Sequence, residues 1–290
     1  MIDLNGRVAI VTGAGGGLGR AHARLLAQRG ARVVVNDLGD GAETVAREIV
    51  DAGGQARAIL GSVTDAARMQ EMVEETVRDW KRVDILVNNA GILRDKTFAK
   101  MSLDDFLMVV DVHLMGAVHC TKAVWDVMRT QNYGRIVMTT SSSGLYGNFG
   151  QSNYGAAKMA LVGLMQTLAL EGAKYDIRVN CIAPTAATHM TEDLLPPGQL
   201  ALLRPELVSP GVLALVSEDA PTRAILCAGA GGFELANITL TKGIFIPGDA
   251  PLAETLLARW TEVADRGGEA VPAQGAVQGQ CELKKAGVVV

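Results

Sequence analysis

Short runs of β-branched and aliphatic residues alternate along the chain with longer segments in which apolar residues recur at helical spacing. The runs that predict strands are Val8–Val11, Arg32–Asn36, Ala58–Leu60, Ile85–Asn88, Arg135–Thr139, Ile177–Ile182 and, as a seventh, Ala224–Cys227. Helical spacing is found in Leu18–Gln28, Ala66–Trp80, Leu103–Met128 and Asn153–Ala173. Strands that alternate with helices form right-handed βαβ units. We therefore predict an α/β fold, a doubly wound parallel sheet of about seven strands with helices on both faces.

The alternation continues without a break in composition to about residue 248. It is followed by one amphipathic helical pattern, Pro251–Ala264, and from Arg266 the chain is rich in Gly, Ala and Gln. Such a composition is typical of loosely ordered segments. We expect a single dinucleotide-binding domain over residues 1–248, which includes the substrate loop, and a C-terminal helix with a loosely ordered tail over residues 249–290.

Composition narrows the class of protein. Lys and Arg number 27 and Asp and Glu 31, a formal net charge of −4, whereas nucleic-acid binding usually needs a basic excess. The four cysteines form no Cys-x-x-Cys pair, which favours reduced thiols. The first residues lack a signal-peptide pattern, no apolar stretch reaches the ~20 residues of a membrane span, and the last three residues are not a peroxisomal signal. We expect a cytoplasmic protein that binds neither nucleic acid nor a membrane.

Part of a large glycine content, 33 residues, lies directly after the first predicted strand. There Gly13, Gly17 and Gly19 fit Thr-Gly-x-x-x-Gly-x-Gly rather than the common Gly-x-Gly-x-x-Gly. Glycines allow the backbone to approach a pyrophosphate, and the N-terminus of the following helix favours negative charge. Taken alone, the same run is also compatible with a glycine-rich turn that binds nothing.

A carboxylate at the end of the second strand favours a dinucleotide. Asp37 lies 24 residues after Gly13, and an acidic residue about 20 residues on is the expected partner of the adenosine ribose. Its charge would repel a 2′-phosphate, and no Arg or Lys within Leu38–Ala42 offsets that repulsion. The pattern favours NAD over NADP, although Asp37 is also compatible with a role in starting a turn.

A second group of residues has the spacing of a proton-transfer site. Tyr154 and Lys158 lie one helical turn apart, so they share one face. A phenol has a pKa near 10 and is a poor base at neutral pH, but a neighbouring ammonium stabilises the phenolate. Ser141 comes 13 residues earlier, after the strand Arg135–Thr139. The adjacent Ser142 and Ser143 fit a polar turn better.

Together these motifs resemble the short-chain dehydrogenase/reductase family over roughly residues 5–247. The resemblance is carried by Thr12–Gly19, Asn88-Asn89-Ala90-Gly91, Ser141, Tyr154, Lys158, and Asn180 with Pro184. The segments VVVNDLG, NNAGILRDKTFAK and YGRIVMTTSSSGLYGNFGQSNYGAAK, with Ile182-Ala183-Pro184, are similar to one branch of the family. That branch is the (3R)-hydroxyacyl-CoA dehydrogenase unit of peroxisomal multifunctional enzymes of type 2.

The resemblance implies a role for each site residue. Ser141, Tyr154 and Lys158 would be catalytic, and His113 stands where many relatives have a catalytic Asn. For His113 a packed helix histidine bonded to the backbone is the alternative. The cofactor contacts implied are Gly13, Gly17, Leu18, Gly19, Asp37, Ser62, Val63, Asn89, Ala90, Gly91, Tyr154, Lys158 and Thr188. No metal site is implied, because the four histidines lie in different predicted elements.

The resemblance also implies a reaction. We expect an oxidoreductase with a Rossmann-type fold that transfers a hydride between NAD and a (3R)-3-hydroxyacyl-CoA, giving the 3-ketoacyl-CoA, within fatty acid and lipid metabolism. Two alternatives stay open: a dehydrogenase of a steroid or another small alcohol or ketone, and a non-catalytic NAD-binding protein. Arg94, Lys96 and Lys100 would meet the CoA phosphates or be solvated surface charges.

The partners implied are a small-molecule substrate, with acyl-CoA first, and a second or further copies of the chain. We expect a homodimer or homotetramer formed through long apolar helices such as Leu103–Met128 and Asn153–Ala173. We also expect a free-standing relative of the dehydrogenase unit, so that any enoyl-CoA hydratase of the same pathway is a separate protein.

Overall fold

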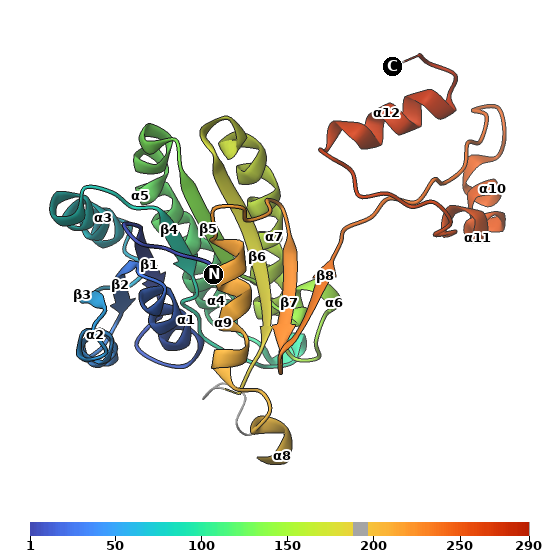
Figure 1. Ribbon diagram of the computed structural model, residues 1–290. Helices are drawn as coiled ribbons and strands as arrows, with labels where there is room; N and C mark the ends of the chain where they lie inside the picture. Colours follow the sequence, from blue (N-terminus) through green and yellow to red (C-terminus); the bar gives the residue numbers. More distant parts are fainter. Residues whose placement is uncertain (188–196, 290) are drawn as a thin grey trace. The chain divides into compact units, whose positions relative to one another are not determined.

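The computed structural model describes residues 1–187 and 197–289. Its centre is a sheet in the order β3-β2-β1-β4-β5-β6-β7-β8 (Figure 1). The strands are β1 (Val8–Thr12), β2 (Arg32–Asp37), β3 (Gln55–Leu60), β4 (Ile85–Asn88), β5 (Gly134–Thr139), β6 (Ile177–Thr185), β7 (Ile225–Gly229) and β8 (Gly232–Ala236). From β3 to β7 every pairing is parallel. The predicted doubly wound parallel sheet is confirmed.

Helices cover both faces of the sheet (Figure 1). One face carries α1 (Gly17–Gln28), α2 (Gly41–Asp51) and α9 (Ser209–Leu215), and the other carries α3 (Ala66–Trp80), α4 (Leu103–Val110), α5 (Gly116–Gln131) and α7 (Ser152–Gly172). Shorter elements are α6 (Ser142–Tyr146), α8 (Pro197–Leu200) and 3₁₀ turns at Phe98–Lys100, Ala173–Tyr175 and Pro205–Leu207. Helix α3 begins and ends where its spacing predicts. At its start the Asp65 carboxylate accepts a hydrogen bond from Arg68 N and caps the helix.

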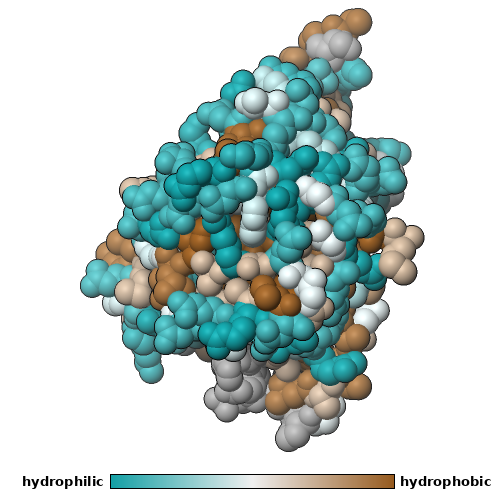
Figure 2. Space-filling view, turned by 60° about the vertical axis from the view of Figure 1, so that its left-hand side comes forward, coloured by the Kyte–Doolittle hydropathy of each residue, from teal (hydrophilic) through white to brown (hydrophobic). Residues whose placement is uncertain are grey.

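The core between these layers is aliphatic. Every residue of β1, β4 and β5 is buried, as expected of parallel strands covered on both faces. At the surface, hydrophilic side chains predominate on the face shown in Figure 2, with apolar side chains gathered across its middle.

The predicted helix Leu103–Met128 consists of α4, a π-helical segment at Asp111–Met115, and α5. The combined run, Leu103–Gln131, is long enough and apolar enough to cross a membrane, and its most apolar 18-residue window has a mean hydropathy of 1.3. The prediction that no apolar stretch reaches this length is therefore wrong. In the structure 44% of its most apolar window is buried, and the run packs against α3 and α7, as a helix that covers a sheet does.

Strand β8 was not predicted. It follows β7 after only Ala230 and Gly231, whose φ angles of 51° and 84° are both positive. Two such residues form the type of turn that joins a hairpin, and a connection this short joins only antiparallel strands. The short, glycine-flanked strand gives no periodic signal of its own, which is why about seven strands were expected.

By its internal contacts the chain divides into two compact units, Met1–Leu235 and Ala236–Val290. The second unit contains α10 (Leu252–Ala258), α11 (Trp260–Val263) and α12 (Ala276–Lys285). The predicted helix Pro251–Ala264 is thus broken at Arg259, and a helix lies within the tail expected to be loosely ordered. Lysines in the last turn of α12 favour it, since cations stabilise a helix C-terminus. That residues 1–248 fold as one domain remains a proposal.

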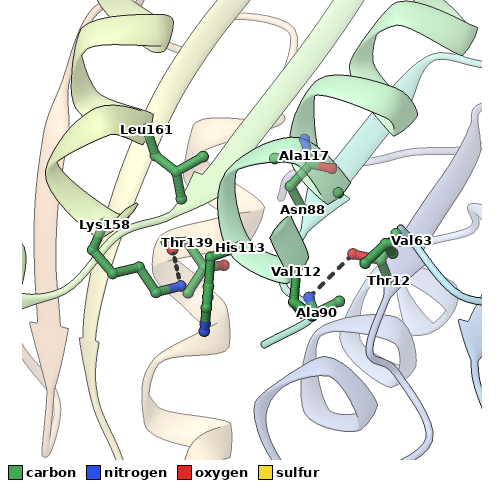
Figure 3. Close-up of a pocket in the computed structure, with 11 residues that line it drawn as sticks. Thr12, Val63, Asn88, Ala90, Val112, His113, Ala117, Thr139, Lys158 and Leu161 are labelled. Atoms are coloured by element: carbon green, nitrogen blue, oxygen red, sulfur yellow. Dashed lines mark hydrogen bonds between the residues drawn. The ribbon is translucent and has the colours of Figure 1, made fainter. Parts of the chain in front are cut away.

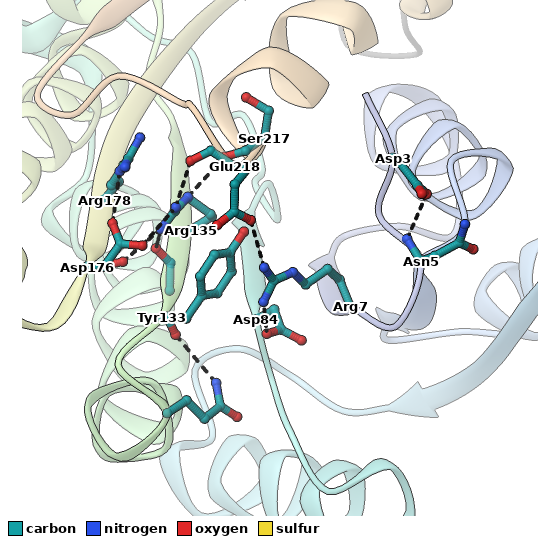
Figure 4. A network of polar contacts seen from close by, with 12 residues as sticks. Asp3, Asn5, Arg7, Asp84, Tyr133, Arg135, Asp176, Arg178, Ser217 and Glu218 are labelled. Atoms are coloured by element: carbon teal, nitrogen blue, oxygen red, sulfur yellow. Dashed lines mark hydrogen bonds and ion pairs between the residues drawn. The ribbon is translucent and has the colours of Figure 1, made fainter. Parts of the chain in front are cut away.

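The amino-terminal edge of the sheet is held by buried charges (Figure 4). The fully buried Arg135 donates hydrogen bonds to the carbonyl oxygens of Asp176, at 2.7 Å, and of Ser217 and Glu218, both at 3.0 Å. Nearby, the buried Asp84 carboxylate pairs with Arg7 and Arg82. These bonds connect the ends of β1, β4, β5 and β6 far from the glycine-rich loop.

Replacement of Asp84 should test this edge. Its carboxylate accepts hydrogen bonds from Arg82 Nη2 at 2.6 Å and Val8 N at 2.8 Å, so Asp84→Ala leaves a buried amide and a cation unpaired. We expect a loss of about 3 kcal/mol in the free energy of unfolding, measured by urea titration. Asp79→Ala, which removes a half-exposed partner of Arg57, should cost at most about 1 kcal/mol. Equal losses in the two variants would contradict this interpretation.

Candidate active site

The glycine-rich loop is locked to the end of β4. Thr12 Oγ1 accepts hydrogen bonds from Asn89 N and Ala90 N, at 3.0 and 3.1 Å. The Asn89 side-chain amide donates to the carbonyl oxygens of Thr12 and Gly13, both at 3.0 Å. Gly13 has φ +61°, and a Cβ there would lie 2.7 Å from Ala90 Cα. Only glycine fits at this position, and Asn89 holds the loop in place.

Beside this loop lies a cleft of about 330 Å³ at the carboxyl ends of the strands. Nine of the predicted cofactor residues line it: Gly13, Gly17, Leu18, Asp37, Ser62, Val63, Asn89, Ala90 and Gly91. Gly19 is placed differently, because its Cβ would lie 2.2 Å from Gly13 O, so this glycine lets α1 pack on the loop. Thr188 lies outside the described residues.

The cleft fits a dinucleotide phosphate. α1 begins at Gly17, which lines the cleft, and the N-terminus of a helix attracts anions. A Cβ at Gly16 would meet no described atom within 4 Å, so the backbone is open to a ligand there. The cofactor would be held by the loop from Gly13 to Gly17 at its phosphates.

Asp37 lies at the rim of this cleft. Its Oδ2 accepts a hydrogen bond from Gly15 N at 2.8 Å, and its Oδ1 accepts one from Leu38 N at 2.7 Å. These two bonds fix the carboxylate between β2 and the glycine loop. No Arg or Lys lines the cleft among the residues that the structure describes, so the negative charge of Asp37 dominates its rim.

Ser141, Tyr154 and Lys158 come together from two elements. Ser141 follows β5, and its Oγ accepts a hydrogen bond from Ser143 N at 3.2 Å. Tyr154 and Lys158 lie in the first turns of α7, with Lys158 Nζ 5.4 Å from the centre of the Tyr154 ring. Lys158 Nζ donates to Thr139 O at 2.5 Å. The predicted arrangement of a phenol, an ammonium and a hydroxyl is present.

Burial dominates the protonation of this group. It raises the pKa of the Tyr154 phenol, a hydrogen bond with Ser141 lowers that pKa, and the charge of Asp95 raises it further. Burial also lowers the pKa of Lys158 to about 7. The expected lowering of the phenol's pKa by Lys158 is therefore not found in the protein alone, because both groups are withdrawn from water.

His113 lies in the π-helical segment, edge-on to Tyr154, with the two ring centres 5.1 Å apart. Its Nε2 lies 3.1 Å from Ile92 N and 2.8 Å from Ile92 O. Burial and the charge of Lys158 lower the pKa of His113 to about 3, against the effect of the Ile92 bond. A Cβ on Gly91 would lie 2.3 Å from His113 Cε1. Gly91 thus makes room for a neutral imidazole bonded to the backbone.

Behind Lys158 is a cavity of about 10 Å³, enough for roughly one water molecule (Figure 3). Three buried atoms of residues lining it have no hydrogen-bond partner in the described part of the chain, namely Asn88 Oδ1, His113 Nδ1 and Thr139 Oγ1. A space of this size with several polar groups is typical of a buried hydration site.

Three polar residues at the site were missed by the sequence analysis: Asp95, Gln151 and Asn153. The side chain of Asn153 is fully buried, donates to Arg94 O at 3.1 Å and accepts from Tyr154 N at 2.7 Å. Gln151 donates to Asp95 at 2.6 Å. The signal in the sequence is a pair of amide residues, Gln151 and Asn153, next to Tyr154.

The cations considered for CoA phosphates are partly engaged. Lys96 Nζ lies 3.0 Å and Arg94 Nε 3.9 Å from the Asp105 carboxylate. Contact of Arg94, Lys96 or Lys100 with CoA remains a proposal. In the described ranges no group of three His, Cys, Asp or Glu side chains is arranged to hold a metal ion.

Comparison with known proteins agrees with this geometry. Residues 7–197 match the family model of the short chain dehydrogenases. The chain is 46% identical over 277 residues to the peroxisomal hydratase-dehydrogenase-epimerase of Saccharomyces cerevisiae, covering 91% of this chain and 31% of that protein. It thus spans about a third of the length of that multifunctional relative.

A relative of similar length is a short-chain type dehydrogenase/reductase of Mycobacterium tuberculosis, 46% identical over 92% of this chain and 97% of that protein. The full-length peroxisomal multifunctional enzyme type 2 of Drosophila melanogaster superimposes with a TM-score of 0.84 and 40% identity, covering 98% of this chain and 50% of that one. The chain therefore belongs to the short-chain dehydrogenase/reductase family and is an oxidoreductase of that family.

Proposed function

We propose that the enzyme oxidises (3R)-3-hydroxyacyl-CoA thioesters to 3-ketoacyl-CoA with NAD. The observation that carries this proposal is the extent of the similarity to the hydratase-dehydrogenase-epimerase. It covers 91% of the chain, whereas the family model ends at residue 197. The likeness therefore includes the region after the catalytic helix, in which members of this fold differ by substrate.

In the proposed reaction the cofactor accepts the hydride, and residues of the chain hold the substrate oxygen and take its proton. When bound, oxidised NAD supplies the hydride acceptor and a positive charge beside Tyr154. The Ser141 hydroxyl donates a hydrogen bond to the alcohol oxygen, since its own oxygen already accepts from Ser143 N. Tyr154 Oη takes the hydroxyl proton as the carbonyl forms. Ser141 and Tyr154 thus hold one oxygen from two sides.

Lys158 keeps that proton transfer possible. With a pKa of about 7, its ammonium form predominates below neutral pH and the neutral amine above it. A phenolate and an ammonium in one buried space stabilise each other, so the two groups titrate as a pair. The bond from Lys158 Nζ to Thr139 O fixes the amine next to the ring while it changes charge.

The setting of the reaction is also proposed. We propose a cytoplasmic enzyme of lipid metabolism, with the peroxisome as the alternative because several relatives are named peroxisomal enzymes. The chain would act as a homodimer or homotetramer. Sedimentation of the purified chain as a monomer would contradict the proposed oligomer.

The mechanism predicts the behaviour of Tyr154→Phe. Loss of the phenol oxygen removes the proton acceptor, so NADH formation should fall by about 1,000-fold or more. NAD binding, measured by quenching of intrinsic fluorescence, should stay within about threefold of the wild type, because the cleft is intact. A variant that keeps its turnover would show that another group accepts the proton.

The cofactor preference depends on Asp37. In Asp37→Ser the repulsion of a 2′-phosphate disappears, so kcat/KM for NADP relative to NAD should rise by roughly 100-fold. The matched control is Asp40→Ser, which removes an exposed carboxylate three residues further on. Steady-state kinetics with both cofactors measure the ratio. If both variants keep the wild-type ratio, Asp37 does not select the cofactor.

The substrate assignment is tested with a panel. NADH formation should be at least about tenfold faster, as kcat/KM, with (3R)- than with (3S)-3-hydroxyacyl-CoA, and slower still with hydroxysteroids and simple secondary alcohols. Chain lengths from short to long are included. If no (3R)-3-hydroxyacyl-CoA reduces NAD while a hydroxysteroid does, the acyl-CoA assignment is wrong and the enzyme is a steroid dehydrogenase.

A further inference from the structure

Three consecutive residues of the segment after β4 each hold one residue at the start of the catalytic helix. Arg94 O accepts a hydrogen bond from the Asn153 side chain at 3.1 Å. The Asp95 carboxylate accepts one from Gln151 Nε2 at 2.6 Å. Lys96 N donates to Gly150 O at 2.9 Å. Residues 94–96 therefore form a strap across the entrance to α7, with Asp95 at its centre.

The Asp95 carboxylate decides which way the Gln151 amide points. Gln151 Oε1 accepts hydrogen bonds from Ser143 Oγ at 2.8 Å and from Asn148 Nδ2 at 3.0 Å. A flipped amide would set its oxygen against the carboxylate and its NH₂ against that of Asn148. Gln151 is only 9% exposed, so it has little water to compensate for such contacts. The carboxylate allows one orientation of the amide.

That orientation is passed on to the active-site serine. Ser143 uses its hydroxyl to donate to Gln151 and its backbone N–H to donate to Ser141 Oγ. The second bond occupies a lone pair of Ser141, so the hydroxyl hydrogen points to the reacting groups: it is donated to Tyr154 in the free protein and would be donated to the substrate oxygen in the complex. Asp95, Gln151, Ser143 and Ser141 thus form one chain of donors and acceptors that connects the strap with the reacting hydroxyl.

We propose that Asp95 is a positioning residue for catalysis: through Gln151 and Ser143 it sets the Ser141 hydroxyl against the oxygen whose proton Tyr154 accepts. This inference rests on the proposed role of Tyr154 as proton acceptor. No contact of Asp95 with substrate or cofactor is needed, because its effect reaches the substrate through the hydrogen-bond chain.

The charge effect can be separated from the hydrogen-bond effect. Within the described part of the chain, the groups that act on Tyr154 are Ser141 from the loop after β5, Lys158 from its own helix, His113 from the π-helical segment and Asp95 from the strap. Among these groups Asp95 supplies the negative charge, which raises the pKa of Tyr154. Asp95→Asn keeps an acceptor for Gln151 and removes only that charge, whereas Asp95→Ala removes both.

The test compares these variants of the 290-residue chain with NAD and the best secondary alcohol of the substrate panel. Asp95→Ala should lower kcat by ~10- to 100-fold with KM for NAD unchanged, since small misplacements of reacting groups cost rates of this order. Asp95→Asn should keep kcat at high pH within about threefold and shift the acid limb of kcat/KM down by about half a pH unit. Removal of a negative charge makes the phenol easier to ionise, which gives the direction of this shift.

The matched control is Asp104→Asn, which removes an exposed charge from the first turn of α4. Within the described residues the Asp104 side chain makes no hydrogen bond or ion pair. It should leave both kcat and the acid limb unchanged. If Asp95→Ala keeps the wild-type kcat, or Asp95→Asn keeps the wild-type acid limb while Tyr154→Phe is inactive, Asp95 has no positioning role and the proposed function stands. If Tyr154→Phe is fully active, the proposed function itself fails. If Asp95→Ala does not fold, the role of Asp95 is tested by the acid limb of kcat/KM in Asp95→Asn alone.

Discussion

Lys158 Nζ is buried at the carboxyl edge of an aliphatic sheet and donates its hydrogen bond to the carbonyl oxygen of Thr139. Withdrawal of an amine from water is costly unless it is hydrogen-bonded or loses its charge, and here both occur, since its pKa falls to about 7. The same constraint governs the other polar groups of this edge. Thr12 and Asn89 lock the glycine loop, and Asn153 joins the strap to the catalytic helix. The active site is built from the partners that these buried groups require.

At the amino-terminal edge of the sheet, buried polar groups also need partners, and there they are charged groups that pair with one another. There Asp84 and Arg135 are fully buried, and each makes several hydrogen bonds. The Tyr133 ring lies between two guanidinium groups. The distance from the ring centre to the guanidinium carbon is 3.6 Å for Arg7 and 4.1 Å for Arg135. This network serves the register of the strands, while the carboxyl edge retains groups whose protonation changes.

The sequence allowed prediction of those features that depend on local order. Helix Ala66–Trp80 has its period and its cap within 16 residues, and the pair Tyr154 and Lys158 is defined by one turn of helix. Features that depend on contacts between residues far apart in the chain could not be predicted from the sequence. Asp95 and Gln151 lie 56 residues apart and meet only because β4 and β5 are neighbours. The hairpin to β8 was not predicted for another reason, because its turn at Ala230 and Gly231 leaves no periodicity. The positive φ angle at position 231 explains why a glycine stands there.

His113 shows how one buried side chain determines the residues around it. An imidazole with a pKa of about 3 is neutral at physiological pH, so His113 cannot relay a proton by holding it as a cation. It acts through hydrogen bonds, with Nε2 at the Ile92 backbone and Nδ1 facing the cavity behind Lys158. The ring needs space that only a residue without Cβ leaves at position 91. Gly91 and His113 are therefore a matched pair, and Gly91→Ala would displace the imidazole that packs against Tyr154 before it disturbed the cofactor cleft.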